Sequence, residues 1–190
     1  PLPPASMSKL MTLYMAFEFI KAGRLGLEEK LPVSKNAANY AGSTMFLNPT
    51  DRIEVLDLIR GIIVQSGNDA CIAIAEGISG SESLFAEELN LLAKEMGMMN
   101  SSFTNSTGWP DPDHLTTIQD LLTLTVRTIE DFPELYYYYA EKEFTYSGIR
   151  QLNRNPLLFN EINADGLKTG DNKRTDKFIV KRRNKRKDTK

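Results

Sequence analysis

The sequence is poor in several residue types on which common enzyme sites depend. It has one cysteine, Cys71, which excludes an internal disulfide. It has one histidine, His114, so a Ser-His-Asp triad would have to use it, although its setting in Asp111-Pro112-Asp113-His114 is more typical of a turn. No cluster of histidine, cysteine and acidic residues has zinc spacing, and no glycine-rich loop matches a phosphate-binding motif. We therefore expect no metal and no cofactor.

Long apolar runs are also missing. No stretch approaches about 18 uninterrupted apolar residues, so the sequence predicts no membrane-spanning helix. The first residues lack the charged stretch, apolar run and cleavage site of an export signal, although a chain that opens at Pro1 leaves room for one upstream. With 190 residues, 41% of them hydrophobic and 25% charged, the chain has the size and composition of a globular domain.

The net charge of −2 hides an uneven distribution. Residues 1–170 hold 13 basic and 22 acidic residues, whereas residues 171–190 hold 10 basic and 3 acidic ones. Such a basic run could bind nucleic acid or another polyanion, but Phe178 is the only aromatic residue within it. We therefore expect residues 171–190 to form a disordered or aberrant tail with no nucleic-acid partner.

The spacing of apolar residues predicts a largely helical chain. Helices are expected at about 5–23, 51–65, 68–77, 81–96 and 116–132, with Thr50 or Asp51 capping the second and a Thr116/Gln119 capping box opening the last. A polar loop follows at 100–114, and strand patterns appear at 143–146 and 166–170. The sequence thus predicts an α+β fold, with one domain over 1–170 and no linker before residue 171.

An S-x-x-K motif, Ser6-Met7-Ser8-Lys9, stands at the start of the first predicted helix. Side chains three residues apart lie on one helix face, so Lys9 could take the proton of Ser6. The helix N-terminus favours a developing alkoxide, and burial would favour a neutral amine. Alone, the motif is more typical of an N-cap serine beside a surface lysine, since about one S-x-x-K is expected by chance in a chain of this length.

Two further motifs fall at predicted element boundaries. Ser66-Gly67-Asn68 would expose a hydroxyl for proton relay and an amide for a peptide-like substrate, or would simply be a glycine turn. Lys168-Thr169-Gly170 would supply positive potential, a hydroxyl for a carboxylate and room for close backbone approach, or would be an ordinary strand and turn. A strand at this position could also pair with an extended peptide.

The three motifs occur together in the order typical of penicillin-binding proteins and class A β-lactamases, with Gly67 where that pattern has Asp. Over residues 4–170 the chain resembles the serine-type D-alanyl-D-alanine carboxypeptidases, the low-molecular-mass penicillin-binding proteins. The segments that carry the resemblance are Pro4–Thr12, Gly42–Leu47, Gln65–Ala70, Asn105–His114, Gln151–Asn155 and Asp165–Gly170. The resemblance implies the helical lobe of a β-lactamase/DD-peptidase fold with a small remnant of its antiparallel sheet.

The resemblance also implies a mechanism. Ser6 would attack the penultimate D-Ala of a peptidoglycan stem peptide, with Lys9 as base and Ser66 and Lys168 relaying protons, before water hydrolyses the acyl-enzyme. β-Lactams would acylate the same serine as covalent inhibitors.

Further residues would bind the substrate. Thr169, with Gly170, would hold its carboxylate, Asn68 its peptide amide group, and Arg154 would add positive charge. The oxyanion hole would use the backbone N–H of Ser6 and of residue 171.

Relative to that family the chain resembles a member truncated at both ends, without the membrane anchor and with apolar helix surface left uncovered. Because peptidoglycan lies outside the cytoplasmic membrane, the resemblance implies an exported protein, in the periplasm or on the outer face of that membrane. Two alternatives stay open: a related DD-endopeptidase or β-lactamase-like enzyme, and an inert fragment whose tail binds polyanions. The Trp109-Pro110-Asp111-Pro112 segment favours the carboxypeptidase.

Overall fold

The computed structural model describes residues 1–160, 164–172 and 175–180. Its elements run in the order η1 (Ala5–Ser8), α1 (Lys9–Lys21), β1 (Lys30–Pro32), α2 (Lys35–Ala38), β2 (Arg52–Glu54), α3 (Val55–Arg60), η2 (Gly61–Gln65), α4 (Asn68–Ser79), α5 (Glu82–Glu95), α6 (Ile118–Asp131), α7 (Pro133–Tyr136), η3 (Tyr137–Ala140), β3 (Glu143–Tyr146), β4 (Ile149–Leu152), α8 (Leu157–Asn160), β5 (Lys168–Asn172) and β6 (Thr175–Val180).

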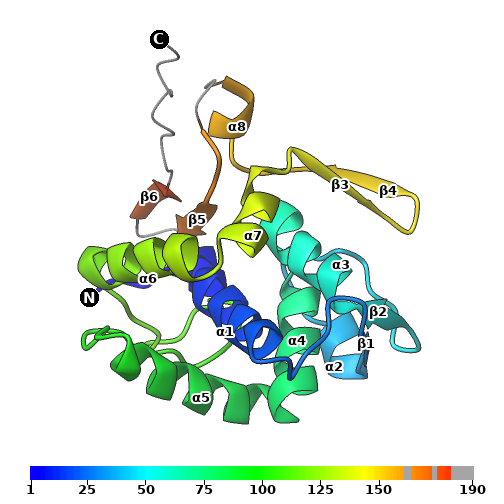
Figure 1. Cartoon of the computed structure of the whole chain (residues 1–190), viewed down its shortest axis with the longest axis horizontal. Helices are drawn as coiled ribbons and strands as arrows, with labels where there is room; N and C mark the ends of the chain where they lie inside the picture. The colour runs from blue at the N-terminus through cyan, green and yellow to red at the C-terminus, as the bar shows by residue number, and fades with distance from the viewer. Residues whose placement is uncertain (161–163, 173–174, 181–190) are drawn as a thin grey trace.

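Helix α1 forms the centre of the core. Every side chain from Lys9 to Phe17 is buried, as expected of a helix that is apolar on nearly all faces. Helices α4, α5 and α6 pack against it, and Figure 1 shows α1 enclosed among them. The first residue of α1, Lys9, is therefore held in a closely packed part of the molecule.

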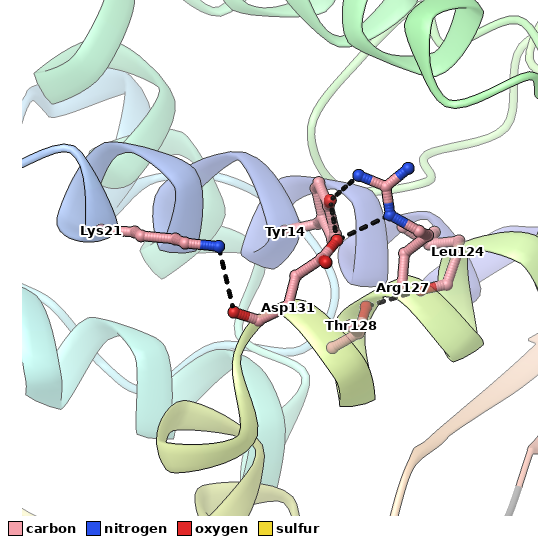
Figure 2. A network of polar contacts seen from close by, with 6 residues as sticks. All are labelled: Tyr14, Lys21, Leu124, Arg127, Thr128 and Asp131. Atoms are coloured by element: carbon pink, nitrogen blue, oxygen red, sulfur yellow. Dashed lines mark hydrogen bonds and ion pairs between the residues drawn. The ribbon is translucent and has the colours of Figure 1, made fainter.

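A polar network ties α1 to α6 (Figure 2). The Tyr14 hydroxyl and the Arg127 Nε each donate to the Asp131 carboxylate at 2.7 Å, and Arg127 also reaches the Tyr14 oxygen at 3.3 Å. Lys21, in the last turn of α1, donates to the Asp131 carbonyl. These contacts join the middle and the last turn of α1 to the C-terminal part of α6.

The strands of the described residues form three antiparallel pairs, β1–β2, β3–β4 and β5–β6. The predicted α+β class, with a small antiparallel sheet beside a helical lobe, is confirmed. The β5–β6 pair extends beyond residue 170, since Gly170 pairs with Phe178 and Asn172 with Thr175. Residues 173–174 and 181–190 of the predicted tail lie outside the described residues, and the domain division at 170 stays a prediction.

Two predicted helix starts are wrong. Thr50 and Asp51 cap no helix, because Arg52–Glu54 pairs with β1 as strand β2 and places Ile53 in the core. The last long helix is capped by Thr117 rather than Thr116: the Thr117 hydroxyl accepts from the Asp120 N–H. Thr116 instead exchanges backbone hydrogen bonds with Leu2, which the capping-box pattern could not reveal.

An apolar groove of about 430 Å³ lies between the N-terminal segment and α6, lined mainly by Leu2, Pro4, Met7, Ile118, Leu121 and Leu122. Ile118 is 74% exposed and Leu122 is 53% exposed. Apolar side chains of α6 are therefore exposed along this groove. Among the described residues, none of the helices combines the length and the apolar character needed to cross a bilayer.

Candidate active site

Ser6 lies in the 3-10 turn η1, one turn before Lys9 opens α1. The Lys9 Nζ is 3.2 Å from the Ser6 Oγ, so the predicted pairing of the two side chains is present. Ala5, directly before the serine, has φ +48°, a left-handed conformation rare for a residue with a side chain. Such strain is concentrated at functional sites, where the surrounding structure holds it in place.

The Lys9 amine is buried and anchored. Its Nζ also donates to the Thr107 carbonyl at 2.5 Å, in the loop before α6. Burial lowers the pKa of Lys9 to about 8, with Arg154 contributing in the same direction and Cys71 opposing it. A neutral amine that donates to Thr107 keeps its lone pair available for the Ser6 hydroxyl, which is the state that a base requires.

A second lysine–serine pair joins the turn between η2 and α4 to strand β5. The Lys168 Nζ donates to the Ser66 Oγ at 3.0 Å, and both side chains are buried. The pKa of Lys168 is lowered to about 7, mainly by burial and also by the positive charges of Lys9 and Arg154. Ser66 ends the π-helical turn η2 in a left-handed conformation, with φ +61° and ψ +36°. This abrupt ending turns the Ser66 side chain away from the helix axis toward β5.

Strand β5 lies directly against the nucleophile turn. A Cβ built on Gly170 would lie 3.0 Å from the Met7 Cγ and 3.2 Å from the Pro4 carbonyl oxygen, so a side chain there would force the strand away. Thr169 is partly exposed on the same strand, between the buried Lys168 and Gly170. The structure thus brings the first and third motifs together across more than 150 residues of sequence.

Asn68 and Arg154 are both attached to the segment around Ser43. The Asn68 side-chain amide donates to the Ala41 carbonyl at 2.7 Å, and its backbone N–H donates to the Ser43 carbonyl. Arg154 donates to the Ser43 hydroxyl at 2.6 Å. Neighbouring Asp69 secures the same segment, since its buried carboxylate accepts from the backbone N–H groups of Met45 and Leu47.

A cleft of about 1040 Å³ opens beside Ser6. Its lining includes Ser6, Lys9, Ser43, Asn68 and the segment 107–112 with Trp109. Trp109 is 44% exposed, and Tyr40 packs against it edge to face. An elongated ligand that lies in this cleft would reach the Ser6 hydroxyl.

Comparison with known proteins agrees with this arrangement. A family model described as D-alanyl-D-alanine carboxypeptidase matches residues 1–189. The chain belongs to the D-alanyl-D-alanine carboxypeptidase family.

Individual members of the carboxypeptidase family are similar in sequence and in structure. The chain is 42% identical over 176 residues to D-alanyl-D-alanine carboxypeptidase DacC of Escherichia coli, a match that covers 89% of this chain and 44% of that protein. Penicillin-binding protein 6B of E. coli superposes with a TM-score of 0.94 at 35% identity, over 98% of this chain and 61% of the other. Penicillin-binding protein D2 of Listeria monocytogenes, in its ampicillin-bound form, superposes at 0.84 with 25% identity, over 96% and 74%. The chain spans less than half the length of the curated carboxypeptidase from E. coli.

Sequence reasoning missed part of this site. The turn predicted at Asp111–His114 is confirmed, since the His114 backbone N–H donates to the Asp111 carbonyl. The missed feature is the His114 ring, which is buried with its Nε2 2.6 Å from the Ser8 Oγ beside Lys9. The Thr107 carbonyl that receives Lys9 could not be predicted either, because a backbone group carries no residue-type signal. The only available signal for His114 was its being the single histidine, in a segment that resembles the family.

The described residues contain no group of three or more histidine, cysteine or acidic side chains that could hold an ion. All eight of the predicted site residues fall within the described part of the chain and lie at the cleft or on the elements beside it: Ser6, Lys9, Ser66, Asn68, Arg154, Lys168, Thr169 and Gly170. Their roles in a reaction are taken up below.

Proposed function

We propose that the chain carries the acyl-serine site of a D-alanyl-D-alanine carboxypeptidase that releases the terminal D-Ala of peptidoglycan stem peptides. The observation that carries the proposal is the 3.2 Å contact between the Ser6 Oγ and a buried Lys9 amine whose pKa burial has lowered to about 8. Family membership supports the substrate class. The site would act where peptidoglycan lies, on the outer side of the cytoplasmic membrane.

In the proposed reaction the Ser6 Oγ attacks the carbonyl carbon of the penultimate D-Ala, and the serine proton passes to the Lys9 Nζ. The backbone N–H groups of Ser6 and Asp171 would stabilise the oxyanion of the tetrahedral intermediate. When the carbon–nitrogen bond breaks, the leaving D-Ala amine takes a proton through the Ser66–Lys168 pair. Water then hydrolyses the acyl-serine ester and restores the free hydroxyl.

Substrate binding is assigned to the groups around this centre. Thr169, with the close approach that Gly170 permits, would bind the terminal carboxylate, and Arg154 would add positive charge near it. Asn68 would bind the peptide amide group. β-Lactams would bind in the same place and acylate Ser6, a proposal supported by the ampicillin-bound form of the Listeria relative.

The first test is covalent labelling of Ser6. Incubation with benzylpenicillin is expected to add one penicilloyl group to the intact chain in mass spectrometry, and Ser6→Ala is expected to show no adduct because the nucleophile is gone. The neighbouring Ser8→Ala variant keeps Ser6 and should still gain one penicilloyl group after a long incubation. A folded wild-type chain that gains no adduct, or an adduct that persists in Ser6→Ala, would contradict the proposal.

The acylation rate is expected to rise with pH. A base accepts a proton only when neutral, and the pKa values of Lys9 and Lys168 stand at about 8 and about 7. The rate constant for acylation should therefore fall roughly tenfold per pH unit below about pH 7 and level off above about pH 9. Stopped reactions between pH 5.5 and 9.5, followed by mass spectrometry, measure this profile. A rate that is constant between pH 6 and 9 would exclude both lysines as the base.

The β-lactamase alternative differs in the rate of the second step, the hydrolysis of the acyl-serine ester. A carboxypeptidase of this kind keeps the penicilloyl adduct long enough to isolate it, whereas a β-lactamase hydrolyses the adduct quickly. Product analysis with a stem pentapeptide and with a cross-linked muropeptide separates carboxypeptidase from endopeptidase. The Trp109–Pro112 wall of the cleft is part of the resemblance to the carboxypeptidases and favours the first.

A further inference from the structure

We propose that His114 is a positioning residue that fixes the Lys9 amine by binding Ser8 and closing the 104–114 loop onto the nucleophile turn. This inference rests on the proposed acyl-serine function and concerns a residue outside the three motifs. His114 is buried, with 2% of its surface exposed, and it borders the same cleft as Ser6 and Lys9.

The hydrogen bonds around His114 determine which ring nitrogen carries the proton. The backbone N–H of Thr104 points at the Nδ1 from 3.1 Å, and a backbone N–H can only donate. The Nδ1 therefore accepts, and in a neutral imidazole the proton is on the Nε2. The Nε2–H then donates to the Ser8 Oγ at 2.6 Å. The ring therefore accepts a hydrogen bond from the Thr104 backbone N–H and donates one to the Ser8 hydroxyl, and this pair of hydrogen bonds is called the His114 bridge.

The His114 ring is neutral near pH 7, so both of its hydrogen bonds keep their donors and acceptors. Burial lowers the pKa of His114 to about 4, opposed by the Asp111 carboxylate and aided by the Lys9 ammonium. The Phe103 ring packs edge-on against the imidazole and keeps water from that side. The Thr104 hydroxyl also lies 3.2 Å from the Nδ1 and can donate to it. Protonation of Nδ1 would set its N–H against the Thr104 backbone N–H at 3.1 Å, so the neutral ring is the form that fits.

The bridge acts on Lys9 through two short connections. Ser8 is the residue before Lys9, and both are buried at the start of α1. On the loop side, Gly108 lies against the Ser8 Oγ, since a Cβ there would be 3.0 Å from it. Gly108 follows Thr107, whose carbonyl accepts from the Lys9 Nζ. The hydrogen bond between His114 and Ser8 thus connects the 104–114 loop to the start of α1, and these two segments position the Lys9 amine.

Hydrogen bonds within the 104–114 loop hold its shape independently of His114. The effect of His114 on the position of the loop can therefore be distinguished from an effect on folding. The Asn105 Oδ1 accepts from the backbone N–H groups of Thr107, Gly108 and Trp109, so the 105–109 turn keeps its shape without His114. Loss of His114 is therefore expected to shift this turn relative to Ser8 rather than to unfold it. A displacement of about 1 Å at a reacting group lowers a rate by about 100-fold.

A matched pair of variants isolates the bond to Ser8. Glutamine places its amide nitrogen near the position of Nε2, so His114→Gln keeps the donor to Ser8. Asparagine places its oxygen near Nδ1, so His114→Asn keeps the Thr104 contact and loses the Ser8 contact. We expect His114→Gln to acylate with benzylpenicillin within about 3-fold of wild type, and His114→Asn and Ser8→Ala to acylate about 10- to 100-fold more slowly. The loss should appear in the acylation rate constant rather than in the concentration for half-maximal rate.

The double variant and the histidine spectrum complete the test. Because His114 and Ser8 act through one bond, His114→Asn/Ser8→Ala should be no slower than the slower single variant. With ¹⁵N-histidine, the single imidazole of the chain should show the Nε2–H tautomer at pH 6 to 8. Independent losses that multiply in the double variant, a His114→Asn variant as fast as wild type, or an Nδ1–H tautomer would overturn the proposal.

These readouts also separate this proposal from the proposed function. If the folded wild-type chain forms no adduct, the acyl-serine function fails. The position of the Lys9 amine then decides the role of His114 without reference to activity. The ¹³Cε shift of Lys9 should give a pKa near 8 in wild type and in His114→Gln, and a changed pKa in His114→Asn. An identical Lys9 titration in all three would refute positioning by His114.

Discussion

Replacing Lys9 by methionine is expected to lower the rate of Ser6 acylation by about 10²- to 10⁴-fold while the chain stays folded. Methionine has nearly the length of lysine and suits a buried site, so it removes the amine without opening a cavity. What disappears is the proton acceptor 3.2 Å from the Ser6 Oγ. Time courses of benzylpenicillin adduct formation by mass spectrometry, beside circular dichroism for folding, measure the effect.

The matched control lies at the other end of the same helix. Lys21 is exposed in the last turn of α1, where it donates to the Asp131 carbonyl and lies over the Phe132 ring, so Lys21→Met should acylate at the wild-type rate. If Lys9→Met acylates as fast as Lys21→Met, another group removes the serine proton. Lys168 would then be the leading candidate, because its amine is bound to Ser66 and its pKa is also lowered.

Substituting alanine for Gly108 is expected to abolish measurable acylation and to lower the free energy of unfolding by about 3 kcal/mol. Gly108 has φ +79°, and a Cβ on it would overlap the Ala5 carbonyl oxygen and lie 2.5 Å from the carbonyl carbon. Ala5 is the strained residue directly before the nucleophile. Relief of the overlap must therefore move either the Ser6 turn or the Thr107 carbonyl, and both hold the Lys9–Ser6 pair. Urea unfolding and adduct formation measure the two effects.

Gly80 provides a control with the same backbone angle. Its φ is also +79°, but a Cβ there meets nothing within 4 Å. Gly80→Ala should cost only the left-handed backbone penalty, about 1–2 kcal/mol, with acylation unchanged. Equal losses of stability in both variants, with acylation retained in Gly108→Ala, would mean that the contact with Ala5 does not position the nucleophile.

The helical part of the fold was largely predictable because its signals are local. The apolar spacing within 68–77 and 81–96 reports burial directly, and Ser81 caps α5 as its residue type suggests. The start of the second helix was wrong because Arg52–Glu54 is a strand only through its partner, β1, more than 20 residues earlier. Propensity within a window carries no information about such a partner.

The candidate site was predictable to the extent that residue type carries the chemistry. Ser6, Lys9, Ser66 and Lys168 meet in the pairs that the motifs suggested. The Thr107 carbonyl, the His114 bridge and the close approach of Gly108 to Ala5 were not predictable. They depend on where the 104–114 loop returns to the start of α1, which is a property of the packed chain.

The two buried amines have a thermodynamic consequence for the evolution of this chain. Folding lowers the pKa of Lys9 to about 8 and that of Lys168 to about 7 from an ordinary value of 10.5. Between pH 7 and 10.5 the unfolded chain therefore binds more protons than the folded one, and stability rises with pH across that window. At neutral pH both lysines oppose folding. Selection for stability alone would replace both lysines by apolar residues. A homologue that has lost Lys9 and Lys168 but keeps the core is therefore expected to have lost the acyl-serine reaction.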